Sequence, residues 1–475
     1  MQSILENKCL GSFIDNNFVC DTKAKAFSCK SVVTGETWMK LYPITKIQAQ
    51  RAIKSSYKCF NSLKKLSHYH RRDLLNKAAD IIDLNKEIIA RVITSEMGKT
   101  YKESIDEINY AANYLKWFSS EAISKSGYCT PSEKPNKRIS VIYEPIGVCG
   151  IITPWNFPIA MAARKIAPAI AAGCTALVKP ASETPITMLL VAEAFRKAGI
   201  APGALQVLIG DEKIIGDSLI DSKHIKKISF TGSTKTGKIL YQNLAKSLKV
   251  ATMELGGNAP LIIANDAEID TSVNETIKAK LRNLGQSCVA ANRIFVQKNI
   301  KMLFLKKLKE KVKKLKTGNP FSKDVDLTNI LHPKSIKKMQ RHIDDALKKG
   351  AKIQLKGKSF AHPHILDNCT ESMELFSEET FGPLFAIFEF ETDSEAVKYA
   401  NKSEYGLAAY VFTRDLKRAY FFAENLQCGM VGINDGEFSS HQLPFGGVKN
   451  SGFGREGGPF GIFEYLTEKA ISTNL

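Results

Sequence analysis

Apolar side chains repeat at helical spacing over residues 68–122, and short apolar runs typical of strands follow them. From Gly147 onward, such runs alternate with helical segments: GVCGIIT (147–153), CTALV (174–178), LQVLI (205–209), KKISFT (226–231) and VATMEL (250–255). Strands that alternate with helices predict βαβ units and a parallel sheet with covered faces. Because such crossovers are right-handed, this region is predicted to be a doubly wound, Rossmann-like domain of the nucleotide-binding type.

A second alternating region follows the first. Its apolar runs are PLIIAN (260–265), RIFV (293–296), LFAIFEF (384–390), AAYVFT (408–413) and MVGIN (430–434), and a helix is predicted over 268–284. Residues 127–145 carry prolines and a polar run before a strand, the pattern of a projecting β-arm. The predicted fold class is therefore α/β, with two α/β domains and a small β-arm.

The composition is that of an ordinary folded protein. The chain has 475 residues, of which 44% are hydrophobic and 24% charged, and this excludes a disordered or fibrous protein. The net charge of +19 comes from 67 Lys and Arg against 48 Asp and Glu. Because no single tail concentrates this excess, we predict no nucleic-acid partner. The most basic stretch, 301–316, has apolar residues at helical spacing and predicts an amphipathic surface helix.

No segment of the sequence indicates a membrane partner or secretion. The most apolar stretch, 166–178, is too short to span a bilayer and contains Pro168 and Gly173. The first residues lack the basic and apolar regions of a secretory signal. Ten cysteines are too sparse for a disulfide scaffold, and they form no C-x-x-C pair. We therefore expect a cytoplasmic protein.

Several short segments carry side chains with chemical potential. Cys288 follows a predicted helix on a Gly-containing connection, where it fits either a nucleophile or a small buried hydrophobe. Glu254 ends a predicted strand, where its carboxylate either faces a crevice or caps a turn. Asn156 lies between two prolines, which either aim its amide at an oxyanion or make a rigid turn. FTGSTKTG (230–237) fits an anion-binding helix start or an ordinary capped helix.

Together these segments form an ordered set that resembles the aldehyde dehydrogenase superfamily essentially from end to end. The set is PWNFP (154–158), KPAS (179–182), FTGSTKTG (230–237), ELGGNAP (254–260), GQSC (285–288), EETFGP (378–383) and PFGGVKNSGFGRE (444–456). The 34-residue gap from Glu254 to Cys288 belongs to the same pattern. Within the superfamily, ITPWNFP, RNLGQSCVAANR and GINDGEFSS are most similar to the succinate-semialdehyde dehydrogenase branch.

The resemblance implies an enzyme that oxidises an aldehyde to a carboxylate and passes hydride to NAD(P)⁺. It makes Cys288 the nucleophile, which forms a thiohemiacetal and then a thioester. The side-chain amide of Asn156 and the backbone N–H of Cys288 are the implied oxyanion donors. Glu254 is the implied general base that activates water for thioester hydrolysis. No metal is implied.

The resemblance also places the cofactor along the C-terminal edge of the first sheet. The implied contacts are Trp155, Lys179, Ser182, Gly232, Ser233, Leu255 and Glu379. Lys179 and Glu379 would hold the two ribose units, and Gly232 and Ser233 would meet the pyrophosphate. Ser182 stands where NAD-preferring relatives often carry Glu, so we predict NADP⁺, while the neighbouring Glu183 keeps NAD⁺ possible.

The predicted substrate is a small aldehyde with a distal carboxylate, namely succinate semialdehyde. Arginine suits a planar carboxylate, and Arg164 and Arg282 lie close in sequence to Asn156 and Cys288. Ser439 matches the third carboxylate contact of the branch. The alternative for either arginine is a salt bridge between domains. One methylene changes binding by only ~1–3 kcal/mol, so a glutarate-semialdehyde or broad-specificity aldehyde dehydrogenase stays an alternative.

The implied organisation has three parts. These are a dinucleotide-binding domain (1–124 and 146–254), a catalytic domain (255–460) and an oligomerisation arm (125–145 and 461–475). By analogy we expect a homo-oligomer, either a dimer or a tetramer. A binding protein with lost catalysis is the rival from another class, and it predicts damage among the chemical residues. Cys288, Glu254 and Asn156 are all present, which argues against it.

Overall fold

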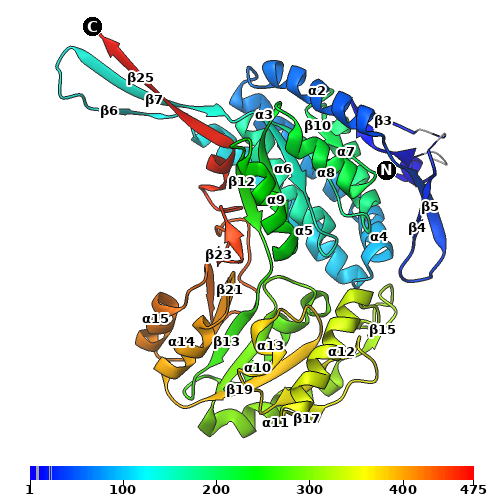
Figure 1. The fold of residues 1–475 in the computed structure, drawn as a ribbon, viewed down its shortest axis with the longest axis vertical. Helices are drawn as coiled ribbons and strands as arrows, with labels where there is room; N and C mark the ends of the chain where they lie inside the picture. Colours follow the sequence, from blue (N-terminus) through cyan, green and yellow to red (C-terminus); the bar gives the residue numbers. More distant parts are fainter. Residues whose placement is uncertain (7–9, 21, 23) are drawn as a thin grey trace.

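The first predicted domain is built on a mainly parallel sheet, seen in the upper part of Figure 1. The computed structural model describes residues 1–6, 10–20, 22 and 24–475. The strand order is β24-β12-β11-β8-β9-β10-β2-β3. The predicted runs form the parallel centre, as β8 (Val148–Ile152), β9 (Thr175–Lys179), β10 (Leu205–Val207), β11 (Ile225–Thr231) and β12 (Val250–Glu254). The short strands β2 (Phe13–Ile14), β3 (Asn17–Phe18) and β24 (Gly452–Phe453) lie antiparallel at the edges.

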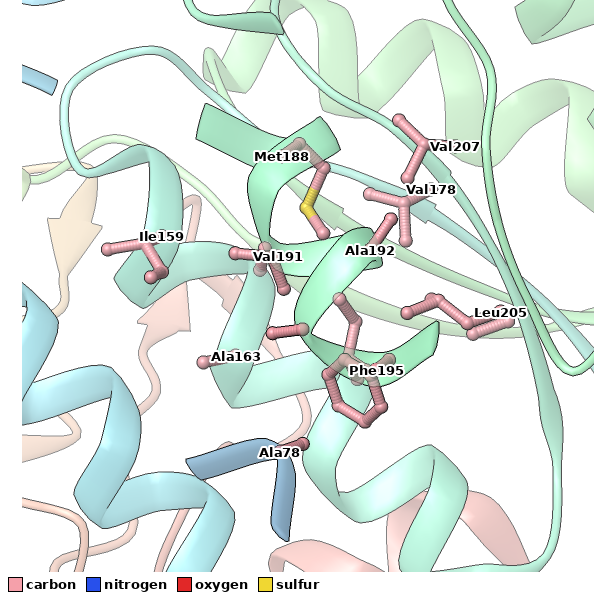
Figure 2. Close-up of a cluster of buried hydrophobic side chains, with 14 of the residues drawn as sticks. Ala78, Ile159, Ala163, Val178, Met188, Val191, Ala192, Phe195, Leu205 and Val207 are labelled. Atoms are coloured by element: carbon pink, nitrogen blue, oxygen red, sulfur yellow. The ribbon is translucent and has the colours of Figure 1, made fainter. Parts of the chain in front are cut away.

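The central strands are buried on both faces because alternate side chains enter different helical layers. In β9, Val178 packs with Phe195 and Leu205 in one layer, drawn in Figure 2, whereas Leu177 belongs to the core of the other. The first layer is formed by α3 (His68–Leu84), α4 (Lys86–Met97), α5 (Tyr101–Ser124), α6 (Pro158–Ala172) and α7 (Pro185–Ala198). The second is formed by α2 (Lys46–Leu63), α8 (Glu212–Asp221) and α9 (Thr234–Ala245).

A second sheet organises the lower part of Figure 1. Its order is β17 (Lys352–Leu355), β18 (His364–Asp367), β19 (Leu384–Phe390), β14 (Ala291–Gln297), β13 (Ala259–Ile263), β21 (Ala408–Phe412) and β22 (Met430–Ile433). All neighbours pair in parallel except β17 with β18. The helices of this region are α10 (Ile269–Leu281), α11 (Lys301–Lys314), α12 (Pro333–Lys348), α13 (Glu374–Ser377), α14 (Asp393–Asn401) and α15 (Leu416–Asn425).

The most basic stretch of the sequence (301–316) and the most apolar stretch (166–178) both lie in the folded domains. In α11, Phe304, Leu308 and Val312 are buried, which confirms the amphipathic helix predicted over 301–316. The apolar stretch 166–178 divides between the end of α6 and β9. Within the part of the chain that the structure describes, no helix has both the length and the apolar character that crossing a membrane requires.

The predicted β-arm projects from the body at the upper left of Figure 1. In it, β7 (Lys137–Pro145) pairs on one side with β6 (Tyr128–Thr130) and on the other with β25 (Leu466–Asn474). Its role in oligomerisation stays a prediction. The domain boundaries also stay predictions, although β24, inside the predicted catalytic range, returns to pair with β12 of the first sheet.

One predicted helix ends earlier than its pattern indicated. The apolar spacing predicted a helix over 268–284, whereas α10 ends at Leu281. Residues 282–285 continue as a single 3₁₀ turn. The helix cannot continue because Asn283 and Leu284 have left-handed backbone angles, with φ of 51° and 52°.

Candidate active site

The strand order of the first sheet reverses around β8, and loops from both domains meet at this point. From β8 the chain moves to β9 and β10 on one side, whereas β11 and β12 lie on the other. Ligands of open α/β sheets bind outside the carboxyl ends of the strands at such a switch point. A cavity of ≈ 350 Å³ lies here. Its wall contains most of the predicted residues, namely Trp155, Asn156, Arg164, Gly232, Ser233, Leu255, Arg282, Cys288, Glu379 and Ser439.

Cys288 reaches the cavity from an unusual backbone turn. Asn283, Leu284 and Gly285 adopt left-handed angles in succession, with φ of 51°, 52° and 73°. Two consecutive non-glycine residues in this region are strained, and they persist only where the surroundings hold them. At Gly285, a Cβ would lie 2.5 Å from the carbonyl oxygen of Gly382, so this turn also needs a glycine for space. The turn lifts Cys288 away from the axis of α10 and toward the cavity.

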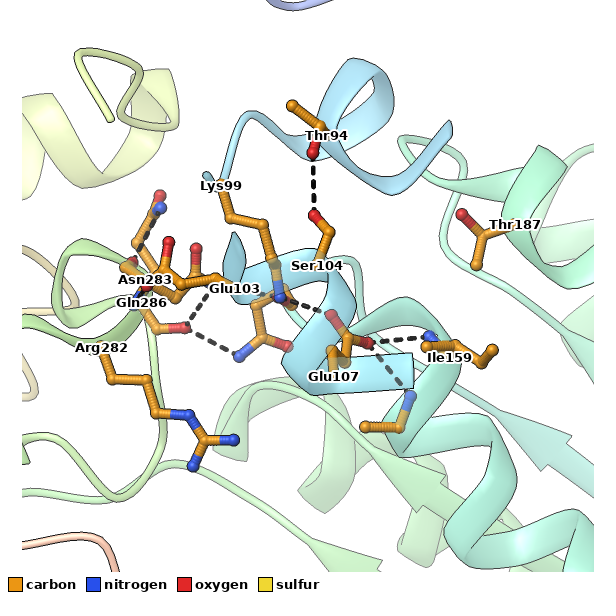
Figure 3. Close-up of polar contacts among 12 residues, drawn as sticks. Thr94, Lys99, Glu103, Ser104, Glu107, Ile159, Thr187, Arg282, Asn283 and Gln286 are labelled. Carbon is orange, nitrogen blue, oxygen red and sulfur yellow. Dashed lines mark hydrogen bonds and ion pairs between the residues drawn. The ribbon is translucent and has the colours of Figure 1, made fainter. Parts of the chain in front are cut away.

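A polar network holds this turn against the loop after β8 (Figure 3). Asn283 donates its backbone N–H to Glu103 Oε1 at 2.7 Å, and its side-chain amide donates to the carbonyl of Asn156 at 2.9 Å. Asn156 in turn donates its side-chain amide to the carbonyl of Gln286 at 2.9 Å. Glu103 is itself fixed, because it completes the capping box with Thr100 at the start of α5. The oxyanion candidate and the nucleophile loop are therefore positioned by one another.

The first turn of α6, just after Asn156, is anchored by a buried ion pair. Lys99 Nζ lies 2.5 Å from Glu107 Oε2, and both side chains are fully buried. The other oxygen of Glu107 accepts the backbone N–H groups of Ile159 and Ala160 at 3.0 and 3.1 Å (Figure 3). A carboxylate at a helix N-terminus is favoured by the helix dipole. Lys99 Nζ also lies 3.8 Å from the ring centroid of Phe157, so the ion pair contacts the residue that follows Asn156 as well as the start of α6.

The backbone of the loop after β12 lies close to the backbone of Cys288. A Cβ on Gly257 would lie 2.1 Å from the carbonyl oxygen of Cys288, so any other residue would push the two segments apart. The backbone N–H of Gly257 donates to Glu379 Oε1 at 3.1 Å. The predicted glycine pair after Glu254 therefore brings a cofactor-contact candidate and the nucleophile to the same point.

The thiol of Cys288 is not ionised by the protein alone. Burial raises its pKa to about 12; the guanidinium of Arg164 lowers it, and the carboxylates of Glu379 and Glu254 raise it. The side chain is nevertheless partly exposed to the cavity. A thiolate therefore needs a base or an additional positive charge, and the local amides do not supply it by themselves.

The carboxyl group of Glu254 is buried. The residue ends β12 as expected, but its side chain is 2% exposed and, of the residues described, it does not line the cavity wall. Neither carboxylate oxygen has a hydrogen-bond partner among the described residues. Burial, and next the charge of Glu456, raise its pKa well above the ordinary value. The charge of Glu254 also acts on the pKa of the Cys288 thiol, so the candidate base lies close to Cys288.

Arg164 combines the two roles that the sequence left open. Its Nε lies 2.7 Å from Glu456 Oε2 in a buried ion pair, and Lys165 pairs with the other oxygen of the same carboxylate. Its guanidinium carbon lies 3.6 Å from the ring centroid of Phe445. Yet Arg164 also lines the cavity, and its Nη2 has no hydrogen-bond partner among the described residues. The guanidinium is therefore held through Nε, and its Nη2 is buried without a hydrogen-bond partner among the described residues, beside the cavity.

Arg282 and Ser439 lie at the cavity wall together with a residue that the sequence did not reveal. Arg282 is 30% exposed, lies 5.1 Å from the ring centroid of Phe157 and faces Glu437 at 3.6 Å. Ser439 Oγ lies 3.2 Å from the hydroxyl of Tyr110, which also lines the wall. Tyr110 comes from the middle of α5, 329 residues away, where an aromatic residue in a helical pattern carries no functional signal. Only the packing of α5 against the second domain shows its position.

The wall opposite these residues carries the candidates for cofactor contact. Trp155 stacks on His332 with ring centroids 4.5 Å apart. Ser233 caps α9 by accepting the N–H of Thr236 at 3.2 Å, and the N–H of Gly232 is already donated to the carbonyl of Glu254. Burial raises the pKa of Glu379 to about 7, so this carboxyl titrates near neutral pH. An aromatic wall, a helix start and a carboxyl group fit a dinucleotide that extends from the cavity.

Lys179 and Ser182 lie beyond the cavity wall and share one partner. Lys179 Nζ lies 2.8 Å from Glu212 Oε1, and Ser182 Oγ donates to the same oxygen at 3.0 Å. Sequence reasoning did not select Glu212. The available signal was its position, because an acidic residue opens the helix that follows a predicted parallel strand. Sequence reasoning also did not select Glu456, although this residue is the last of the motif PFGGVKNSGFGRE (444–456).

Comparisons with known proteins confirm the resemblance that these residues carry. Residues 18–471 match the Aldehyde dehydrogenase family. The chain is 44% identical over 430 residues to a succinate semialdehyde dehydrogenase of Acinetobacter baylyi, covering 89% of each chain. It is 40% identical over 464 residues to a glutarate-semialdehyde dehydrogenase of Pseudomonas putida, covering 97% of each. The solved structure of succinate-semialdehyde dehydrogenase from Burkholderia pseudomallei matches with a TM-score of 0.96 and 39% identity over 98% of each chain. The chain therefore belongs to the aldehyde dehydrogenase family.

Proposed function

We propose that this aldehyde dehydrogenase oxidises succinate semialdehyde to succinate with NAD(P)⁺ as the oxidant. The observation that carries the proposal is a single cavity wall that holds the Cys288 thiol together with Arg164, Arg282 and Ser439. A thiol and two guanidinium groups complement a molecule with an aldehyde at one end and a carboxylate at the other. Relatives that act on semialdehydes of dicarboxylic acids support the same substrate class.

In the proposed first step, the sulfur of Cys288 bonds to the aldehyde carbon and the carbonyl electron pair moves to oxygen. Asn156 donates one N–H of its side-chain amide to the carbonyl of Gln286. We propose that its second amide N–H, together with the backbone N–H of Cys288, donates to this oxygen. Because the pKa of the thiol is raised to about 12, its proton must leave during the attack or before it. Glu254 has a raised pKa and therefore, once ionised, is a strong enough base to accept a proton.

The thiohemiacetal then loses hydride and becomes a thioester on Cys288. Bound NAD(P)⁺ supplies the hydride acceptor. Glu379, Ser233 and Trp155 line the cavity and are the residues that we propose contact the bound cofactor. Before hydrolysis, Glu254 releases the thiol proton to solvent, so that its carboxylate can take a proton from water as the water attacks the thioester carbon. The C–S bond then breaks, the leaving thiolate of Cys288 takes this proton back, and the carboxylic acid product loses its own proton to solvent and leaves as the carboxylate.

The chain length of the substrate and the choice of cofactor are finer points of this proposal. An extra methylene is worth only ~1–3 kcal/mol in a pocket, so glutarate semialdehyde is the second candidate, and the identity to the Pseudomonas putida enzyme favours keeping it. Broad aldehyde specificity is disfavoured by the two arginines at the wall. Ser182, with Lys179 three residues before it, predicted NADP⁺, but Glu212 contacts both side chains, so we propose NAD(P)⁺ without that preference.

The proposal extends to the assembly of the protein and its place in the cell. We propose that the protein works in the cytoplasm as a homo-oligomer, a dimer or tetramer, assembled through the β-arm. The arm supports this because β25 and β6 are largely exposed along their length. Size-exclusion chromatography with light scattering measures the assembly directly, and a monomer would refute it.

Formation of reduced nicotinamide on addition of succinate semialdehyde tests the proposal. We expect activity in the native protein and none in Cys288→Ala, because the nucleophile is gone. Cys129→Ala is the matched control, since Cys129 lies exposed on the arm, away from the cavity. The intact-protein mass of enzyme incubated with substrate alone reports the covalent adduct on Cys288. Full turnover by Cys288→Ala would exclude the mechanism.

A further inference from the structure

We propose that Glu212 makes the protein select NAD⁺ over NADP⁺, by occupying the place that the 2′-phosphate of NADP⁺ requires. The inference deepens the proposed function and rests on it. Glu212 Oε1 accepts a hydrogen bond from Ser182 Oγ at 3.0 Å and lies 2.8 Å from Lys179 Nζ. These are the serine and the lysine from which the sequence predicted the opposite preference, NADP⁺.

The contact lies on the path of a dinucleotide that starts in the cavity. Lys179 ends β9 in register with Ile152 of β8, and its carbonyl accepts the N–H of Thr153. Trp155, two residues further, forms the cavity wall. At the carboxyl edge of a nucleotide-binding sheet, the reacting end lies near the switch point and the adenosine lies over a neighbouring strand. In this proposal the adenosine lies over β9, because Lys179 at the end of β9 accepts the N–H of Thr153 in the loop that leads to Trp155.

The same edge is continuous with the cavity through residues of α12. His332, which caps α12, stacks on Trp155 and lies 4.0 Å from a carboxylate oxygen of Glu183. Glu183 directly follows Ser182 in the chain. The contact around Glu212 is therefore linked to the cavity wall through Glu183, His332 and Trp155, at the ends of β8 and β9.

Charge decides which cofactor this crevice accepts. The carboxylate of Glu212 is 68% exposed, so a ligand can reach it, and the hydrogen bond from Lys179 lowers its pKa, which keeps it ionised at neutral pH. Lys179 is thus already neutralised. A 2′-phosphate carries a charge of about −1.5 to −2, and Lys179, which could neutralise it, is already paired with Glu212. A ribose 2′-hydroxyl, in contrast, can donate a hydrogen bond to the carboxylate.

The N-terminus of α8, the helix that carries Glu212, does not offset the repulsion between Glu212 and a 2′-phosphate. Asp211 caps α8 by accepting the N–H of Ile214 at 2.8 Å, and Glu212 occupies the first turn. Free helix N-terminal amides attract phosphate, but here two carboxylates hold that place. A phosphate at this point meets repulsion from both, and like-charge contacts of this kind strongly disfavour binding.

Equilibrium binding of NAD⁺ and NADP⁺, followed by calorimetry without aldehyde, tests the inference. We expect the native protein to bind NAD⁺ about tenfold more tightly or better, as a repulsive contact at a partly exposed site allows. Glu212→Gln should improve NADP⁺ binding at least about tenfold and change NAD⁺ binding far less. The gain for NADP⁺ should shrink at high salt, because a screened charge is being removed.

The control is Asp217→Asn, which removes an equal charge from the same helix. Asp217 is exposed and pairs with Lys213 rather than with Lys179 or Ser182, so the ratio of the two affinities should stay within about twofold. A native preference for NADP⁺, or a ratio unchanged in Glu212→Gln, would overturn the inference and leave the proposed function intact. If neither dinucleotide binds the native protein, the proposed function itself fails.

Discussion

Replacing Arg282 by alanine separates recognition of the substrate carboxylate from the chemistry at Cys288. Arg282 is the better target of the two arginines, because it is 30% exposed and its ion pair with Glu437 is 3.6 Å long. Its loss should not threaten the fold. If the guanidinium binds the distal carboxylate, only substrates that carry this carboxylate should bind more weakly.

The expected size of the effect follows from the surroundings of Arg282. A hydrogen bond to a charged group is worth roughly 1.5–3 kcal/mol. Partial exposure and the competing carboxylate of Glu437 reduce this to about 1–2 kcal/mol, since exposed ion pairs are weakened by solvent. That corresponds to a loss of roughly 5- to 30-fold in kcat/KM for succinate semialdehyde. Propanal, which has no carboxylate, should lose less than about twofold.

Initial rates with both aldehydes at saturating cofactor provide the assay, and the change should appear in KM rather than kcat. Lys278→Ala is a matched control, because Lys278 is an exposed cation near the C-terminal end of α10, which Arg282 directly follows, and, of the residues described, does not line the cavity wall. Equal losses on succinate semialdehyde and propanal would refute carboxylate recognition by Arg282. So would a fall in kcat with an unchanged KM.

Two further predictions concern stability and pH. Arg164→Ala leaves Glu456 buried with Lys165 as its remaining ion-pair partner among the residues described, so chemical denaturation should show a loss of about 3–5 kcal/mol in the free energy of unfolding; a loss below about 1 kcal/mol would contradict the structural role of this pair. Burial raises the pKa of Glu379 to about 7, and the ionised form is the one that accepts hydrogen bonds from ribose hydroxyls. The affinity for NAD⁺ should therefore rise as the pH increases through about 7, and Glu379→Gln should flatten this dependence; equal slopes would exclude Glu379 as the titrating group.

The sequence alone was sufficient for the fold class and for most of the residues that line the cavity. The apolar runs of both domains became strands because residues with alternating partners on two helical layers must be apolar at every position, as Leu177 and Val178 show. The ordered motifs identified Cys288, Asn156 and Glu379, since backbone geometry and chemistry restrict the residue type at each position. Ten of the predicted contacts meet at one cavity as a result.

Tertiary structure decided how these groups are charged and what they face. Burial, which depends on packing from both domains, raises the pKa of the Cys288 thiol to about 12 and leaves the Glu254 carboxyl without a hydrogen-bond partner among the described residues. Tyr110 and Glu212 reach the site from helices distant in sequence, and Arg164 is half committed to Glu456. No local pattern carries this information, because pKa values and ion pairing depend on distances between segments that only folding brings together.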